Sequence, residues 1–180
     1  MSQKRKNLIG FSLLLAIISF VGFGCTTAAV TSSDAVPTVT SGLLISATTS
    51  SSGGQYAPKN VVAIWVTDNS DKFVKTLYVK AAVRVSDLIK WRSVSSSNKT
   101  DAITGATRDG HGTIYATWNG TDINKKVVAD GTYKVWMEMT ENSGAGPNTS
   151  FTFVKGTANQ TITPANGANF TNITSNWMPL

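Results

Sequence analysis

One heptapeptide combines the residue types of a covalent attachment site: Asp101-Ala102-Ile103-Thr104-Gly105-Ala106-Thr107. It pairs a carboxylate at its start with a small-residue turn and a hydroxyl at its end. A hydroxyl presented after such a turn can be esterified by another enzyme. We therefore interpret this segment as an attachment site for a cofactor.

The spacing Asp-x-x-Ser/Thr-Gly-Ala-Ser/Thr resembles the flavinylation motif of exported electron-transfer proteins, including subunits of sodium-pumping quinone oxidoreductases. In those proteins a magnesium-dependent FMN transferase joins FMN through a phosphoester to the last hydroxyl. The resemblance implies that Thr107 is the acceptor and that Gly105 and Ala106 leave room for the transferase to approach the backbone. It also implies that Asp101 and Thr104 are recognised in an extended segment.

Arg108 and His111, which follow the heptapeptide, extend this hypothesis. Arg108 would help to neutralise the phosphate charge. His111, the only histidine, would donate a hydrogen bond to the phosphate or to the isoalloxazine ring. The alternative is a structural loop in which Asp101 caps a turn, Thr104-Gly105 forms it, Arg108 faces solvent and His111 is an exposed turn residue.

The histidine, cysteine and serine residues of the sequence argue against an enzyme and against a metal site. One histidine without usable cysteines cannot supply converging metal ligands, and no serine lies in a nucleophile motif. The acidic pairs Asp68/Asp71 and Glu138/Glu141 are expected to be solvated turn or strand-end charges rather than a calcium site. We expect no catalysis, and a hydrolase has no supporting constellation.

The amino end indicates export. Lys4-Arg5-Lys6 precedes an apolar run from Leu8 to Phe23, which is too short for a membrane-spanning helix of about 20 residues. A basic start, an apolar middle and small residues describe a secretory signal. The end at Cys25 resembles a bacterial lipoprotein signal, which implies that Cys25 is lipidated, that residues 1–24 are removed, and that the protein is lipid-anchored in the periplasm or at the outer membrane. An ordinary signal cleaved nearby, or an uncleaved anchor, is the alternative.

Composition limits the partners of the mature chain. Three of the 16 basic residues lie in the signal, so 13 remain against 10 acidic residues, and they are scattered. Such a charge distribution excludes nucleic-acid binding. Residues 25–41 are rich in Ser and Thr and are expected to be a tether. Because the only cysteine lies at the signal boundary, the domain must be stabilised by burial rather than by an internal disulfide.

Strand patterns dominate the rest of the chain. Residues 61–67 are nearly continuously apolar, as in a strand covered on both faces, and residues 73–80 alternate and complete a hairpin. Ser86–Trp91 is the one expected helix, with Ser86 as its cap. Five further strands are expected at residues 43–48, 112–118, 131–140, 150–155 and 170–174. These elements predict an all-β, antiparallel immunoglobulin-like β-sandwich over residues 42–180, with one short helix, preceded by a signal/lipoprotein segment.

Two resemblances support this fold. Trp118-Asn119-Gly120-Thr121-Asp122, followed by Asp130-Gly131-Thr132-Tyr133, resembles the immunoglobulin-like repeat of the flagellar hook-cap protein, and implies that Trp118 and Tyr133 pack across the sandwich. Lys125 replaces the glycine frequent in its middle turn, so we expect that turn to differ. The wider layout after Gly42 is similar to a family of predicted periplasmic proteins of unknown function (DUF2271).

These observations predict an exported, lipid-anchored β-sandwich that carries covalent FMN on Thr107 for extracytosolic electron transfer. Its partners would be an FMN transferase, a membrane or extracellular redox protein, and the membrane itself through the lipid anchor. The alternative is a non-catalytic cell-envelope binding or scaffolding module without a cofactor. For that function Trp136 is the best surface aromatic, whereas the other four tryptophans are expected in the core.

Overall fold

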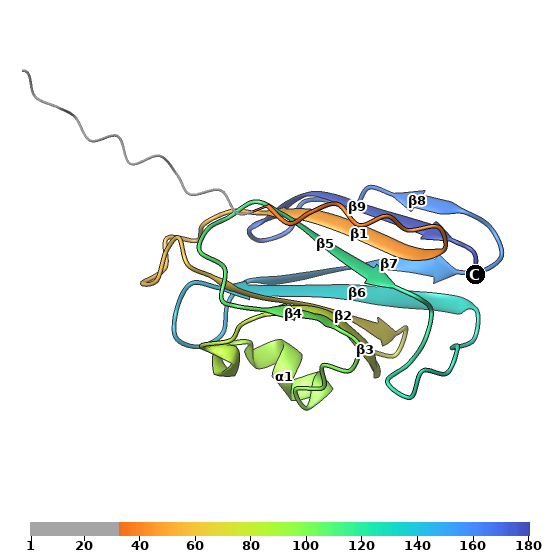
Figure 1. Ribbon diagram of the computed structural model, residues 1–180, viewed down its shortest axis with the longest axis horizontal. Coiled ribbons are helices and arrows are strands. Elements are labelled where there is room, and N and C mark those ends of the chain that lie inside the picture. The colour runs from red at the N-terminus through yellow and green to blue at the C-terminus, as the bar shows by residue number, and fades with distance from the viewer. Residues whose placement is uncertain (1–32) are drawn as a thin grey trace, which may run out of the picture.

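The computed structural model describes residues 33–180, which fold into two stacked β-sheets with a short helix against one outer face (Figure 1). The predicted signal peptide and Cys25 lie outside these residues. The elements in this part of the chain are β1 (Gly42–Thr49), β2 (Val61–Asp68), β3 (Phe73–Lys80), the 3-10 helix η1 (Val85–Asp87), α1 (Ile89–Ser95), β4 (Ile103–Gly105), β5 (Thr113–Trp118), β6 (Gly131–Thr140), β7 (Asn148–Lys155), β8 (Gln160–Ile162) and β9 (Phe170–Met178).

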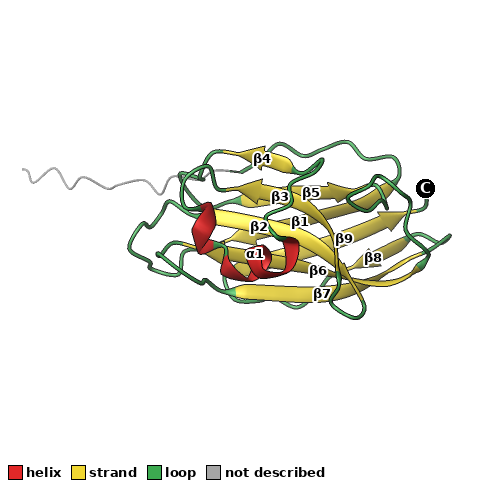
Figure 2. Ribbon diagram, turned by 90° about the horizontal axis from the view of Figure 1, so that it is seen from below, coloured by secondary structure: helices red, strands yellow, loops and turns green. Residues whose placement is uncertain are grey.

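The described strands form a four-stranded sheet in the order β5-β1-β9-β8 and a five-stranded sheet in the order β4-β3-β2-β6-β7. Neighbouring strands are antiparallel except β3 and β4, which run parallel. Parallel neighbours need a crossover connection, and the segment with η1 and α1 supplies it. The helix lies on the outer face of the five-stranded sheet (Figure 2). The predicted β-sandwich with one short helix is confirmed.

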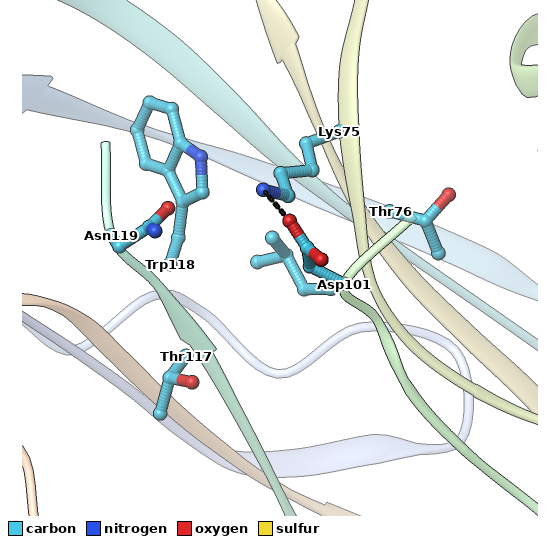
Figure 3. A pocket seen from close by; sticks show the side chains of 7 residues that line it. Lys75, Thr76, Asp101, Thr117, Trp118 and Asn119 are labelled. Carbon is cyan, nitrogen blue, oxygen red and sulfur yellow. Dashed lines mark hydrogen bonds and ion pairs between the residues drawn. The ribbon is translucent and has the colours of Figure 1, made fainter. Parts of the chain in front are cut away.

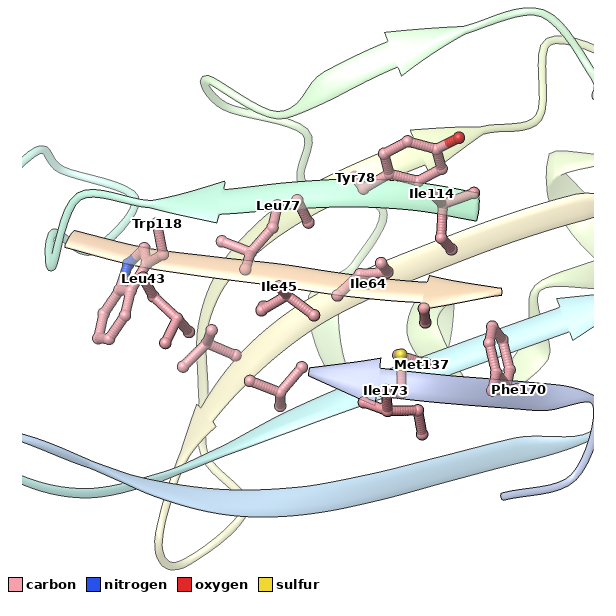
Figure 4. Packing of buried hydrophobic residues seen from close by; sticks show 14 of the residues in the cluster. Leu43, Ile45, Ile64, Leu77, Tyr78, Ile114, Trp118, Met137, Phe170 and Ile173 are labelled. Atoms are coloured by element: carbon pink, nitrogen blue, oxygen red, sulfur yellow. The ribbon is translucent and has the colours of Figure 1, made fainter. Parts of the chain in front are cut away.

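Strand β2 joins the two parts of the core. Val62, Ile64 and Val66 point into the sandwich, where they pack with side chains of both sheets such as Ile45 and Met137 (Figure 4). On its other face, Val61, Ala63 and Trp65 pack beneath the helix with Leu88 and Trp91. All residues from 61 to 67 are buried, which confirms a strand covered on both faces.

The helix begins later than predicted and is capped differently. It starts at Ile89, and no side chain caps it locally, so the assignment of Ser86 as the cap is wrong. Instead, the Glu138 carboxylate from β6 accepts hydrogen bonds from the backbone N–H groups of Lys90 (3.0 Å) and Trp91 (2.8 Å). Burial raises the pKa of Glu138, and these donors oppose that rise. Glu138 is fully buried, so the expectation of a solvated charge is also wrong.

The aromatic contact predicted between Trp118 and Tyr133 is present. The rings of Trp118 and Tyr133 meet edge to face with centroids 5.3 Å apart, which confirms their predicted contact across the sandwich. Lys125 has a φ of 63°, so it adopts the left-handed conformation that glycine favours, although we expected this turn to differ. Trp136 is partly exposed and stacks beside Trp65, with centroids 6.1 Å apart.

Candidate attachment site at Thr107

The middle of the heptapeptide is an exposed strand rather than a turn. Ile103–Gly105 forms β4, the outermost strand of the five-stranded sheet, and pairs in parallel with β3 from Tyr78 to Lys80. Thr104, Gly105 and Ala106 are all exposed. The backbone is therefore extended at Thr104 and Gly105, as the flavinylation motif implies, whereas Asp101 lies in a turn with a φ of 56°.

The start of the heptapeptide is fixed by a buried lysine. The Asp101 carboxylate lies 3.3 Å from Nζ of Lys75, as Figure 3 shows, and Nζ also donates to the Thr121 hydroxyl at 3.0 Å. The Lys75 side chain is only 4% exposed, whereas that of Asp101 is 45% exposed. Asp101 therefore neutralises a buried cation and still offers part of its carboxylate to the outside.

The end of the heptapeptide is fixed by Arg108, the residue after Thr107. Its backbone N–H and C=O both pair with Asn60 at 3.0 Å. Its guanidinium is buried and lies 3.2 Å from the Asp34 carboxylate and 3.0 Å from the Tyr78 hydroxyl. The structural alternative placed this side chain in solvent, and the motif placed it on a phosphate, but its charge is instead countered by Asp34.

Asp34 lies within the predicted tether and binds the domain. Its carboxylate accepts hydrogen bonds from Nζ of Lys80 at 2.6 Å and from the Tyr78 hydroxyl at 2.8 Å. Burial, the main cause, and the neighbouring Asp34 raise the pKa of Tyr78 far above its usual range, so the hydroxyl stays protonated and can donate. The contacts of the domain therefore begin at least eight positions before the predicted boundary at residue 42.

Thr107 lies half-buried between these two anchors. Its hydroxyl donates to the backbone C=O of Val83 at 3.0 Å. It also borders a surface hollow of about 290 Å³. The other residues that line this hollow are Tyr56, Lys59, Val83, Arg84 and Asp109. The hydroxyl is thus outside the hydrophobic core, and a group attached to it would have space beside it.

His111 is neither an exposed turn residue nor part of the hollow. Its Nε2 lies 2.7 Å from Oε1 of Glu141, and its Nδ1 lies 3.3 Å from the Thr49 hydroxyl. The Glu141 side chain is fully buried, which contradicts the expectation of a solvated strand-end charge. Burial alone would raise the pKa of Glu141, but the hydrogen bonds from His111, Ser51 and two backbone N–H groups lower it to about 2.

Glu141 organises the loop that reaches the hollow. Its carboxylate accepts from the Ser51 hydroxyl and from the backbone N–H groups of Ser52 (2.7 Å) and Gly54 (3.2 Å). The same loop continues to Tyr56 and Lys59. Sequence analysis missed Glu141, Tyr56, Lys59 and Arg84, because no local pattern connects them with the heptapeptide.

Comparison with known proteins places this β-sandwich in a family. The model of the family described as predicted periplasmic protein (DUF2271) matches residues 44–172, and the chain belongs to this family. Comparisons with curated proteins and with solved structures give no match. The family description supports the predicted export. Among residues 33–180, no helix is long and apolar enough to cross a membrane.

Proposed function

We propose that this protein is an extracytosolic electron carrier with FMN attached to Thr107 through a phosphoester. The observation that carries the proposal is the setting of the acceptor hydroxyl. It follows an exposed extended strand, lies between two ion-paired anchors, and borders a hollow with cationic and aromatic walls. The flavin would supply reversible electron transfer, and the chain would supply its attachment and surroundings.

The attachment step is a phosphoryl transfer without oxidation or reduction. Thr107 Oγ1 attacks the FMN phosphorus of a flavin dinucleotide held by the transferase. A P–O bond to Thr107 forms, the phosphoanhydride bond breaks, AMP leaves, and the hydroxyl proton passes to a base or to water. In the folded chain, Thr107 must first give up its hydrogen bond to Val83, which costs about 1 kcal/mol.

A transferase can reach this hydroxyl along the sheet edge. In the part of the chain that the structure describes, no strand pairs with the outer edge of β4. An exposed edge offers unpaired backbone groups to which another protein can add a strand. Asp101 and Thr104, which the motif assigns to recognition, lie on this exposed segment.

The proposed lipid anchor would keep the carrier close to a membrane. Asp34 is docked on the domain, and the nine residue steps from Cys25 to Asp34 span at most about 30 Å in a fully extended chain. A lipidated Cys25 would therefore hold the sandwich within a few tens of ångströms of the bilayer. This distance suits exchange of electrons with a membrane redox protein.

The decisive experiment measures the mass of the intact protein. Coexpression with its FMN transferase should add one FMN less one water, and the protein band should fluoresce after denaturing electrophoresis. Thr107→Val should abolish both signals, whereas Thr107→Ser should keep them. Thr100→Val is the matched control, because Thr100 is also half-buried but lies outside the heptapeptide. An unmodified wild-type mass would rule out the carrier.

An unmodified protein would instead support the binding or scaffolding module. The observation in its favour is a second hollow, of about 200 Å³, beside the partly exposed Trp136. The Lys90 ammonium lies 3.9 Å from the centroid of the Trp136 ring, and Thr67 accepts a hydrogen bond from its indole N–H. An aromatic side chain flanked by polar groups is suited to contact a glycan or another envelope protein.

A further inference from the structure

The hollow beside Thr107 is assembled by three loops that are distant in sequence. Tyr56 and Lys59 come from the loop between β1 and β2, Val83 and Arg84 from the segment after β3, and Thr107 from the segment after β4. Glu141 holds the first loop, and the Asn60–Arg108 pairing joins it to the third. The walls of the hollow are therefore positioned independently of any ligand.

Arg84 is fixed in the wall of this hollow. Its guanidinium lies 4.2 Å from the centroid of the Tyr56 ring, and it donates to the backbone C=O groups of Lys59 and Asn142, each at 3.3 Å. Its backbone has a φ of 66°, in the left-handed region. A non-glycine residue in this region is strained, and such strain concentrates at functional sites.

The charge of the hollow suits an anionic ligand. Lys59 and Arg84 contribute two cations and Asp109 one carboxylate. Arg84 also lies 3.8 Å from Asp87, a loose ion pair that leaves its donors engaged mainly with backbone carbonyls. A flavin phosphodiester carries one negative charge, and a reduced flavin can carry a second on its ring. Nearby cations stabilise both charges.

The size of the hollow limits what it can hold. Pockets that enclose a complete small ligand usually measure roughly 300–1,000 Å³. A volume of about 290 Å³ is therefore enough for a ring system but not for a whole FMN. A flavin attached at Thr107 would be only partly enclosed. Partial exposure is what a carrier needs, because its partner must approach the redox ring.

We infer that the hollow is the binding site of the flavin isoalloxazine ring. The ring packs against Tyr56 and Val83, while Arg84 and Lys59 stabilise its anionic reduced form. This inference rests on the proposed attachment at Thr107. It adds that the chain tunes the attached flavin rather than merely tethering it.

Fluorescence tests the contact with Tyr56. A tyrosine in contact with a flavin quenches its fluorescence, so the loaded wild-type protein should become brighter when it unfolds. Tyr56→Leu should raise the native fluorescence toward the unfolded value at an unchanged protein mass. Tyr115→Leu is the matched control, because Tyr115 lies on β5 and does not line the hollow.

Redox titration tests the two cations. Arg84→Gln and Lys59→Gln should each lower the midpoint potential of the attached flavin. Lys59 is exposed, so its variant keeps the test valid if Arg84→Gln perturbs the loops. Arg92→Gln is the control, because Arg92 also donates to a backbone carbonyl but lies on α1.

The outcomes separate the two proposals. A wild-type protein without added mass contradicts both proposals, the attachment of FMN at Thr107 and the binding of the ring in the hollow. If the protein carries FMN, two results together contradict only the binding of the ring in the hollow. The flavin fluorescence is then the same in the folded and the unfolded protein, and Tyr56→Leu, Arg84→Gln and Lys59→Gln behave like their controls. Binding of the ring in the hollow is supported if Tyr56→Leu raises the native flavin fluorescence and if Arg84→Gln and Lys59→Gln lower the midpoint potential.

Discussion

Asp34 Oδ1 lies 3.2 Å from Nη1 of Arg108, which joins a residue near the amino end of the described chain to the residue that follows Thr107. The two residues are 74 positions apart in the sequence. Their ion pair is mostly shielded from water and shares the Tyr78 hydroxyl. The segment that follows the proposed lipid anchor therefore also fixes the carboxyl end of the proposed attachment segment.

Breaking this ion pair should destabilise the domain. Asp34→Asn removes the carboxylate charge that lies 3.2 Å from the buried Arg108 guanidinium, and removal of one partner of a buried pair costs about 3–5 kcal/mol. Urea unfolding should show the loss, and limited proteolysis should cut faster near residues 105–109. Asp109→Asn is the control, because Asp109 is exposed. Equal stability of the two variants would show that the Asp34 contact is dispensable.

Glu141 should make stability depend on acid pH. Its folded-state pKa of about 2 lies below the usual glutamate value of 4.5, so its contribution to stability is present above pH 4.5 and is lost as the pH falls toward 2. A difference of this size corresponds to about 3 kcal/mol. Urea unfolding of wild type and Glu141→Gln between pH 2 and 7 checks it.

The stability difference between these two proteins should be largest near neutral pH and should shrink toward pH 2. Comparison with the variant is needed because the buried Glu138 gives the opposite pH dependence. Its pKa is raised in the folded state, so its contribution to stability is lost as the pH rises through the folded-state value. Parallel pH profiles of the two proteins would contradict the assignment to Glu141.

The sequence was sufficient for the main strands because their signal is local. The apolar run of β2 and the alternation in β3 and β6 each define a buried face within a few residues. Within residues 33–180, the two strands that were missed are β4 and β8. The three residues of β4 are all exposed, and β8 has three residues of which only Ile162 packs against the core, so neither strand has an apolar pattern to detect.

The site was only partly predictable because its key contacts join distant segments. The extended backbone at Thr104 and Gly105 follows from the motif, but the left-handed turn at Asp101 does not. The burial of Arg108 depends on Asp34, and the capping of α1 depends on Glu138, which is 47 positions from Trp91. Residue spacing shows which face of a strand a carboxylate occupies, but it does not show which distant backbone N–H groups will cover that face.

The left-handed turn at Lys125 should be improved by glycine. Lys125 has a φ of 63°, and its ammonium makes only an exposed ion pair with Asp101 at 3.6 Å. Exposed pairs contribute little, whereas the left-handed conformation costs a non-glycine residue about 1 kcal/mol or more. Lys125→Gly should therefore raise the stability by about 1 kcal/mol in thermal or urea unfolding. Lys126→Gly, at a neighbouring position with no positive φ, should lower it slightly.

Thr107 itself should contribute little to stability, although it is the proposed acceptor. Its hydroxyl bonds a backbone carbonyl at a half-exposed position, so Thr107→Val should cost about 1 kcal/mol or less. Thr76→Val provides the contrast. Thr76 is fully buried, donates to the C=O of Asn98 at 2.6 Å and accepts from the indole N–H of Trp91 at 3.0 Å.

Removal of the Thr76 hydroxyl leaves the buried indole N–H and a carbonyl without partners, which should cost about 2–4 kcal/mol. Urea unfolding at equal slopes compares the two variants directly. If Thr107→Val is as costly as Thr76→Val, the Thr107 hydroxyl is a structural group that the fold cannot release, and its esterification would unfold the loop. A small cost for Thr107→Val, by contrast, means that the hydroxyl can leave Val83 and enter a transferase while the sandwich stays folded.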